Sequence, residues 1–154
     1  QESVALGLTA LGKREPDSIV LVHDAARPLT PPQVTERVID AVAGGAGAVI
    51  PVLPVTDTLK TVDAAGVVVG TPRRSDMVAV QTPQGFRWDV LIRAHEEGAS
   101  LGADEARAAT DDAGLVEAIG GTVHTVAGDE RSMKVTRPLD LALAQILVAE
   151  ETSA

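Results

Sequence analysis

The sequence contains no cysteine, and its only two aromatic side chains are Phe86 and Trp88. Without cysteine there are no disulfides, no thiolate zinc sites and no cysteine nucleophile. Because aromatic residues are so few, the core has to be built from Ala, Val, Leu and Ile. Such small, branched side chains suit a sheet covered by helices. The lack of cysteine also fits a cytoplasmic protein.

Long apolar runs and an excess of positive charge are also missing. No run approaches the roughly 18 apolar residues of a membrane-spanning helix, and the first residues do not resemble a basic, apolar signal segment. The chain has 13 Lys and Arg against 22 Asp and Glu, a net charge of −9. Nucleic-acid binding needs a basic surface. We therefore expect neither a membrane nor a nucleic-acid partner, although a local group of cations can still bind phosphate.

A length of 154 residues suits one domain, and the sequence shows no repeats and no linker. The apolar spacing predicts helices and strands that mostly alternate. Helices are expected at 3–11 with Ser3 as N-cap, from 31 to the pair Gly44-Gly45, at 88–98, from 110 and from 138. Strands are expected to end at Val22 and to span 48–52, 58–62, 66–69, 77–82, 122–126 and 133–136, with a loop at 99–109.

The predicted strand–helix–strand unit that runs from Ile19 to Val52 has a right-handed crossover and parallel strands. The pattern changes at 58–69, where two short strands flank the turn Asp63-Ala64-Ala65-Gly66. An isolated two-stranded hairpin is barely stable. From the residues alone we expect a hairpin that folds onto its own domain.

The stretch that organises the chain is Ile19–Val22 followed by His23-Asp24-Ala25-Ala26-Arg27-Pro28. Asp24 and Arg27 stand just past the carboxyl end of a strand, where open α/β sheets bind ligands. A carboxylate can hold a hydroxyl or Mg²⁺, and a guanidinium can bind phosphate. The alternative is a polar turn in which the two side chains pair with each other.

Further polar side chains stand at other strand ends, each with an ordinary alternative. Thr82 can donate a hydroxyl there, and Lys134 faces either solvent or the ligand edge. The pair Arg73-Arg74 is either a solvated turn or a phosphate contact. The paired carboxylates Asp111-Asp112 suit the first turn of a helix and can also assist Mg²⁺. His95, between apolar positions and two glutamates, is expected at the surface.

Four segments in order resemble one family, the 2-C-methyl-D-erythritol 4-phosphate cytidylyltransferases. They are His23-Asp24-Ala25-Ala26-Arg27-Pro28, Pro54-Val55-Thr56-Asp57-Thr58-Leu59-Lys60, Gln81-Thr82-Pro83-Gln84-Gly85-Phe86 and Lys134-Val135-Thr136-Arg137-Pro138-Leu139-Asp140-Leu141. The resemblance implies a Rossmann-like, mostly parallel α/β sheet of the nucleotide-diphospho-sugar transferase type. It also implies a β-arm at about 54–74 that crosses to a second subunit of a homodimer.

The resemblance further implies transfer of a cytidylyl group from CTP to methylerythritol phosphate, with pyrophosphate released and Mg²⁺ or another divalent cation as cofactor. Position by position, it implies that Asp24 holds substrate hydroxyls or lies near the metal, that Ser3, Ala25 and Arg27 contact CTP, and that Lys134 stabilises the reacting phosphorus. Thr58, Arg74 and Thr82 would bind methylerythritol phosphate, with Thr58 and Arg74 arriving from the partner subunit.

Two departures from the family pattern matter. Ser132 stands where the family commonly has Asn, and the chain begins after the family's Gly-rich triphosphate loop. We therefore expect 1–154 to be the C-terminal part of a single domain and to turn over little CTP alone, with a separate N-terminal piece as a candidate partner. Two alternatives stay open, a cytidylyltransferase for ribitol 5-phosphate and an inactive dimerising or binding module.

Overall fold

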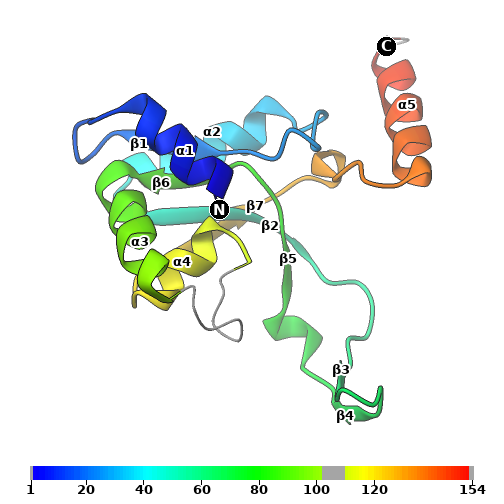
Figure 1. The fold of residues 1–154 in the computed structure, drawn as a ribbon. Helices are drawn as coiled ribbons and strands as arrows, with labels where there is room; N and C mark the ends of the chain where they lie inside the picture. Colours follow the sequence, from blue (N-terminus) through cyan, green and yellow to red (C-terminus); the bar gives the residue numbers. More distant parts are fainter. Residues whose placement is uncertain (1, 102–109, 153–154) are drawn as a thin grey trace.

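The computed structural model describes residues 2–101 and 110–152. Its five-stranded sheet lies between two helical layers, and a hairpin and the last helix stand away from it (Figure 1). The helices are α1 Glu2–Leu11, α2 Pro32–Ala43, α3 Trp88–Leu101, α4 Asp112–Ala118 and α5 Pro138–Thr152, with 3₁₀ turns η1 Arg74–Asp76 and η3 Glu130–Ser132. The strands are β1 Ile19–Val22, β2 Ala48–Pro54, β3 Thr61–Val62, β4 Val68–Gly70, β5 Val78–Val80, β6 Gln84–Arg87 and β7 Val123–Ala127.

The sheet has the order β1-β6-β2, and β2 then pairs with β5 and, in parallel, with β7. Both β1 and β2 are antiparallel to β6, so β1, β2 and β7 run in one direction. The α/β class and the parallel strand–helix–strand unit are confirmed. Every ladder that involves β5 or β6 is antiparallel, so the sheet is mixed and β6 separates the two parallel strands of that unit.

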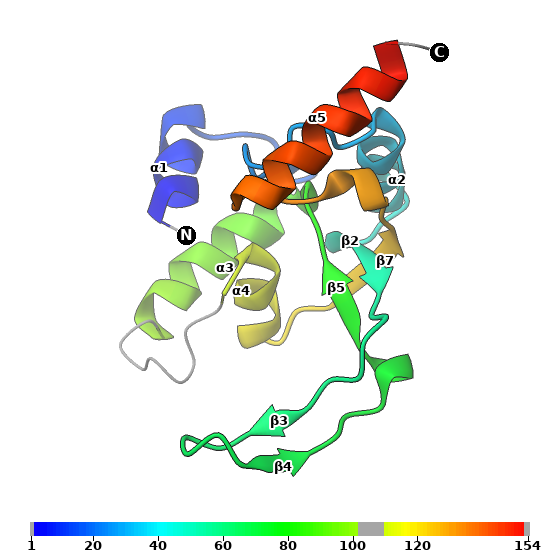
Figure 2. The ribbon, with the colours of Figure 1, turned by 90° about the vertical axis from the view of Figure 1, so that its right-hand side faces the viewer.

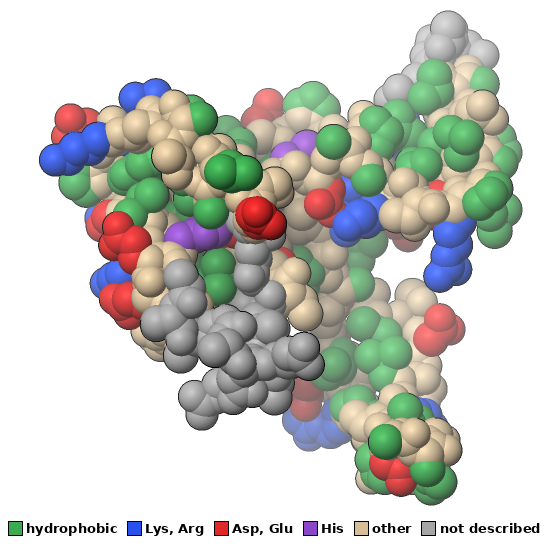
Figure 3. Space-filling model, viewed as in Figure 1, with side chains coloured by type: hydrophobic (Ala, Val, Ile, Leu, Met, Phe, Trp, Pro, Cys, Tyr) green, Lys and Arg blue, Asp and Glu red, His purple; other side chains and the backbone are tan. Residues whose placement is uncertain are grey.

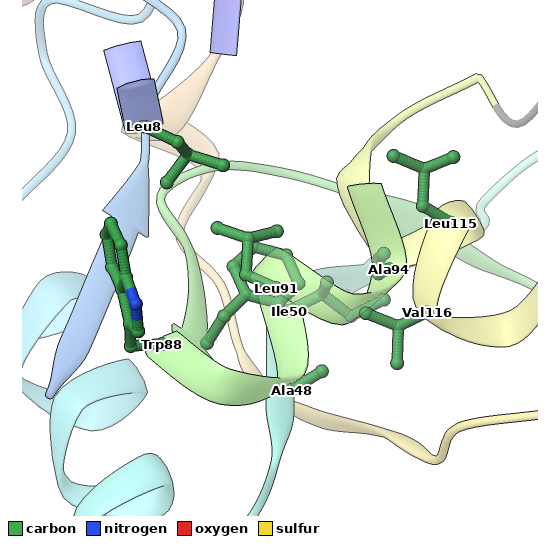
Figure 4. Packing of buried hydrophobic residues seen from close by; sticks show 10 residues of the cluster. Leu8, Ala48, Ile50, Trp88, Leu91, Ala94, Leu115 and Val116 are labelled. Carbon is green, nitrogen blue, oxygen red and sulfur yellow. The ribbon is translucent and has the colours of Figure 1, made fainter. Parts of the chain in front are cut away.

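The larger core lies between the sheet and helices α1, α3 and α4 (Figure 4). Trp88, Leu91 and Ala94 follow the helical period along α3 and are all buried. Phe86 from β6 is fully buried in the same cluster. Both aromatic side chains of the sequence therefore lie in this one core.

The opposite face of the sheet is covered by α2. Pro32 starts this helix, where a missing N–H costs nothing, and Gly44 ends it by donating its backbone N–H to Asp40. Val34, Val38 and Val42 recur every four residues and are buried. The sequence prediction for this helix, including its end at Gly44-Gly45, is confirmed.

The segment 54–74, here called the arm, leaves the body as an extended hairpin (Figure 2). Its strands β3 and β4 are shorter than predicted, and the turn between them is closed by Gly66, whose φ of +82° suits glycine. Asp63 accepts hydrogen bonds from the backbone of Ala65 and Val67. The hairpin does not fold onto the body of its own chain, so the expectation drawn from the residues alone is wrong.

Three other strand predictions differ from the structure. β5 ends at Val80 rather than at position 82, and Gln84–Arg87 forms the unpredicted strand β6. The predicted strand Met133–Thr136 is not a strand and joins neither sheet. The backbone N–H of Val135 donates to the carbonyl of Ala26, in the turn after β1, at 2.7 Å. This segment therefore hydrogen-bonds to the turn after β1 instead of pairing with an edge strand of the sheet.

The helix predictions need smaller changes. Helix α1 begins at Glu2, so Ser3 lies in its first turn instead of at the N-cap. Helix α3 continues to Leu101, through the start of the predicted loop 99–109, and residues 102–109 lie outside the described residues. Over the described ranges, no helix has the length and apolar character needed to cross a membrane.

Candidate active site

A polar cleft of about 410 Å³ opens at the carboxyl end of β1. Segments far apart in the sequence meet there: the start of α1, the turn after β1, the connection from β5 to β6, the start of α4 and the segment after η3. The lining residues are Ser3, Val4, Val22, His23, Asp24, Arg27, Val80, Gln81, Thr82, Gln84, Thr110, Asp111, Asp112 and Lys134. Of the predicted site residues, the cleft brings together Ser3, Asp24, Arg27, Thr82 and Lys134.

Asp24 pairs with both cationic side chains, Arg27 and Lys134, that line this cleft. Its Oδ2 lies 3.1 Å from Nζ of Lys134 and 3.5 Å from Nε of Arg27. The pairing of Asp24 with Arg27, weighed above as the alternative to a site, is therefore present. Two cations surround one carboxylate, however, and the Lys134 side chain is 48% exposed. This corner keeps positive charge that an incoming phosphate can reach.

Arg27 is held far more tightly than Lys134. Its side chain is only 13% exposed, and its Nη1 donates to the carbonyl oxygen of Ser132 at 2.6 Å. Ser132 itself is fully buried, and its hydroxyl has no hydrogen-bond partner among the described residues. Ser132 therefore acts on the site through its backbone carbonyl, a group that any residue at this position has.

Thr82 links two strand ends through its hydroxyl. The backbone N–H of Asp24 donates to Thr82 Oγ1 at 3.0 Å, and Nδ1 of His23 lies 2.9 Å from the same oxygen. The turn is closed further by Arg27 N–H, which donates to the Asp24 carbonyl at 2.9 Å. These contacts fix the backbone that carries Asp24. His23 was not predicted to take part, because only the fold brings it to Thr82.

The start of α4 also lines the cleft, and it holds a histidine–aspartate pair that the sequence did not predict. Both aspartates were predicted in the first turn of a helix from 110, but the helix begins at Asp112, and Asp111 is its N-cap and accepts from the N–H of Gly114. Asp112 is 6% exposed, and its Oδ1 lies 2.8 Å from Nε2 of His95. His95 is thus part-buried and paired, and its predicted surface position is wrong. The two glutamates that follow it in α3 are exposed.

The remaining predicted residues lie elsewhere. Arg74 donates from Nη1 to the carbonyl of Thr56 at 2.8 Å and lines a separate hollow of about 620 Å³ at the base of the arm. Thr58 is exposed on the arm. Ala25 is exposed in the turn after β1 and does not line the cleft. Arg73 pairs with Asp76 at 2.8 Å in an exposed turn, where this arginine lowers the pKa of Asp76.

The metal-ligand inventory is sparse. Within 2–101 and 110–152, no three His, Asp or Glu side chains are grouped so that they could hold a metal ion. Asp24 is a single carboxylate with two cationic neighbours. A resident metal held by protein ligands alone does not fit this arrangement. A Mg²⁺ that brings phosphate oxygens with it does fit, because Mg²⁺ commonly takes only one or two carboxylates from the protein.

A family model described as 2-C-methyl-D-erythritol 4-phosphate cytidylyltransferase matches residues 1–150. The chain belongs to this family. Curated relatives of that name are 50% identical over 149 residues in Rhodococcus jostii (strain RHA1) and 53% identical over 148 residues in Nocardia farcinica (strain IFM 10152). These matches cover 97% and 96% of this chain.

The chain spans about three fifths of these cytidylyltransferase relatives, 62% and 59% of their length respectively. Solved structures agree on the fold. The enzyme of that name from Thermus thermophilus has 42% identity and a TM-score of 0.76, covering 94% of this chain and 66% of that one. The Francisella tularensis structure has 28% identity and a TM-score of 0.84, with coverage of 94% and 65%.

Proposed function

We propose that the protein transfers a cytidylyl group from CTP to 2-C-methyl-D-erythritol 4-phosphate. The observation that carries this proposal is the convergence of Lys134 and Arg27 on Asp24 in one cleft. Three of the four family segments contribute to that cleft, although they are far apart in the sequence. Family membership supplies the choice of substrates.

In the proposed reaction, a phosphate oxygen of methylerythritol phosphate attacks the α-phosphorus of CTP in line. A new P–O bond forms, the bond to the β-phosphate oxygen breaks, and that oxygen keeps the electron pair in the departing pyrophosphate. No covalent intermediate with the protein is needed. The protein's part is positioning and stabilisation of negative charge, for which the exposed ammonium of Lys134 is the reachable cation.

The other cleft residues have supporting roles in this proposal. Arg27, fixed by Ser132, binds nucleotide phosphate from one side, and Ser3 contacts the nucleotide from α1. Asp24 holds Lys134 in place and accepts hydrogen bonds from substrate hydroxyls. Thr82 supports the Asp24 backbone and faces the methylerythritol phosphate.

We propose Mg²⁺ as the cofactor, held by the triphosphate and by Asp24. When bound, it would offset negative charge on the phosphates. We also propose a cytoplasmic location, which the absence of cysteine favours.

The site is proposed to be shared between two copies of the chain. Thr58 and Arg74 do not reach the cleft of their own subunit, whereas the family pattern assigns both to substrate binding. The arm exposes an apolar surface that a second copy can cover, with Val62, Val67, Val68 and Val69 between 55% and 64% exposed. A homodimer through the arm would bring Arg74 to the partner's cleft.

The direct test measures pyrophosphate release from CTP and methylerythritol phosphate by the intact protein that contains this chain. Lys134→Ala should lower kcat and kcat/KM together, by roughly 2.7–4 kcal/mol, because the cation acts mainly in the transition state. Lys13→Ala, an exposed lysine outside the cleft, is the matched control and should keep wild-type constants. A change in KM alone for Lys134→Ala would make Lys134 a simple surface lysine.

A further inference from the structure

Residues 110–112, at the start of α4, form one wall of the cleft. Gln84, on strand β6 of the sheet, holds this wall in place. This side chain is 3% exposed, and its register partner across the ladder is Val22, next to the turn of Asp24. Its Nε2 donates to Asp111 Oδ2 at 2.7 Å, and its Oε1 accepts from the N–H of Ala113 at 3.2 Å. Both ends of one buried amide are therefore used to hold the chain at this wall.

The same wall is held from behind by His95. Its Nε2–H donates to Asp112 Oδ1 at 2.8 Å, and the two side chains are 13% and 8% exposed. His95 lies on α3 and lines a different, largely apolar hollow between α1 and α3. Among the described residues, its link to the polar cleft is Asp112. We therefore expect His95 to act on a ligand in that cleft through Asp112.

The start of α4 needs contacts from other elements to keep its position. Helix α4 has only seven residues, and so short a helix gains little from its own backbone bonds. Asp112 is a buried carboxylate, which is costly unless it is hydrogen-bonded. Gln84 and His95 satisfy the two aspartates and fix their direction. Because neither support is part of α4, the sheet and α3 determine where the wall stands.

We propose that Gln84 and His95 are positioning residues for the hydroxyl-bearing part of the acceptor substrate. The wall 110–112 offers a threonine hydroxyl and carboxylates to the cleft. Carboxylates accept hydrogen bonds from hydroxyls and repel phosphates, so this wall suits a polyol chain and disfavours a triphosphate. Thr82, two residues before Gln84, lies in the same cleft. This inference rests on the proposed function.

The test compares His95→Leu with His95→Gln in the intact protein. Gln keeps an N–H donor near the place of Nε2, whereas Leu removes it and leaves buried Asp112 unpaired. His95→Leu should raise KM for methylerythritol phosphate by about tenfold, with kcat and KM for CTP within about twofold of wild type. His95→Gln should return that KM to within about threefold. The matched control is Arg93→Leu, an exposed position on the same helix.

Gln84→Glu provides a second, independent arm of the experiment. Glutamate keeps the shape of the Gln84 side chain but replaces its Nε2–H donor with a carboxylate oxygen that faces Asp111. The KM for methylerythritol phosphate should then rise by at least about tenfold, on the order of one lost charge-assisted hydrogen bond. If His95→Leu does not fold, this variant decides.

Unchanged KM for the polyol phosphate, or losses of kcat that merely follow the folded fraction, would overturn the positioning role while wild type stays active. An inactive wild type would instead overturn the proposed function, and this inference with it.

Discussion

Valine occupies opposite environments in the body and in the arm. Val38, Val42 and Val49 are 0%, 3% and 0% exposed between α2 and the sheet, whereas Val67, Val68 and Val69 are 59%, 55% and 64% exposed on the hairpin. The sequence pattern predicts regular secondary structure for both groups of valines. It does not show that one group is buried and the other exposed. The comparison shows that the body completes its own core, while the arm presents an apolar surface.

The last helix resembles the arm in this respect. On α5, Leu139 is 78% exposed and Ile146 is 56% exposed, while Ala144 is buried. Figure 3 shows hydrophobic side chains gathered on α5 and on the arm, both apart from the body. Exposed apolar patches of this kind are typical of surfaces that contact something else. The body and these two surfaces should therefore respond differently to substitution.

The largest effect is expected in the body. Phe86→Ala removes a fully buried ring from the core between the sheet and α3 and should lower the free energy of unfolding by about 3–5 kcal/mol. Denaturant unfolding of the 154-residue chain at low concentration measures this.

The matched arm variant is Val69→Ala, which should change the free energy of unfolding by less than about 0.5 kcal/mol. Equal losses at both positions would mean that the arm belongs to the folded core.

A second, smaller effect is expected where β6 touches α2. A Cβ on Gly85 would collide with Val38 and lie 3.2 Å from Val42. Gly85→Ala should therefore cost about 1–3 kcal/mol through overpacking. Gly7→Ala, in helix α1 with open space around the added methyl, should be neutral or slightly stabilising. Thermal unfolding of the two variants side by side tests the contrast, which would disappear if β6 and α2 were loosely packed.

In the arm, a charge should change association rather than folding. Val68→Asp places a carboxylate on the exposed face, so the unfolding free energy at low concentration should shift by less than about 0.5 kcal/mol. The dimer proposed above should weaken by about tenfold or more, because an unpaired charge would be buried at its interface. Sedimentation equilibrium measures this. An unchanged association constant would place the arm outside any interface.

Much of the body could be predicted because its signals are local. The spacing of apolar residues and the Pro and Gly boundaries locate α2, β2 and β7 to within two residues. β6 was missed because Gln84-Gly85 carries no strand signal; its place is set by ladders to β1 and β2.

The candidate site divides in the same way. Asp24, Arg27, Thr82 and Lys134 were found from strand ends and the family pattern, and the fold brings them together. His95 was misplaced because two exposed glutamates follow it, and its partner Asp112 is 17 residues away. Gln84 was not singled out, since a buried amide is recognised only by the contacts that the fold gives it.

The smallest effect concerns the start of α5. Backbone hydrogen bonds from Thr136, then from Arg137, lower the pKa of Asp140 below its ordinary 3.8. Its charged form therefore stabilises this turn above about pH 4, and the contribution is lost as the pH falls through the lowered pKa. An NMR titration of the Asp140 carboxyl should show a midpoint below 3.8. A midpoint at or above that value would mean that the turn is not closed in solution.

The central claim is that the arm of one copy completes the cleft of another. Its most direct test mixes intact Arg74→Ala protein with intact Lys134→Ala protein, each nearly inactive alone, after mass measurement has verified subunit exchange. In a mixed dimer, one cleft carries both substitutions and the other carries neither. Random pairing should then restore about a quarter of wild-type activity per site. If mixed dimers form and activity stays at the level of the parents, Arg74 serves its own subunit and the shared site is wrong.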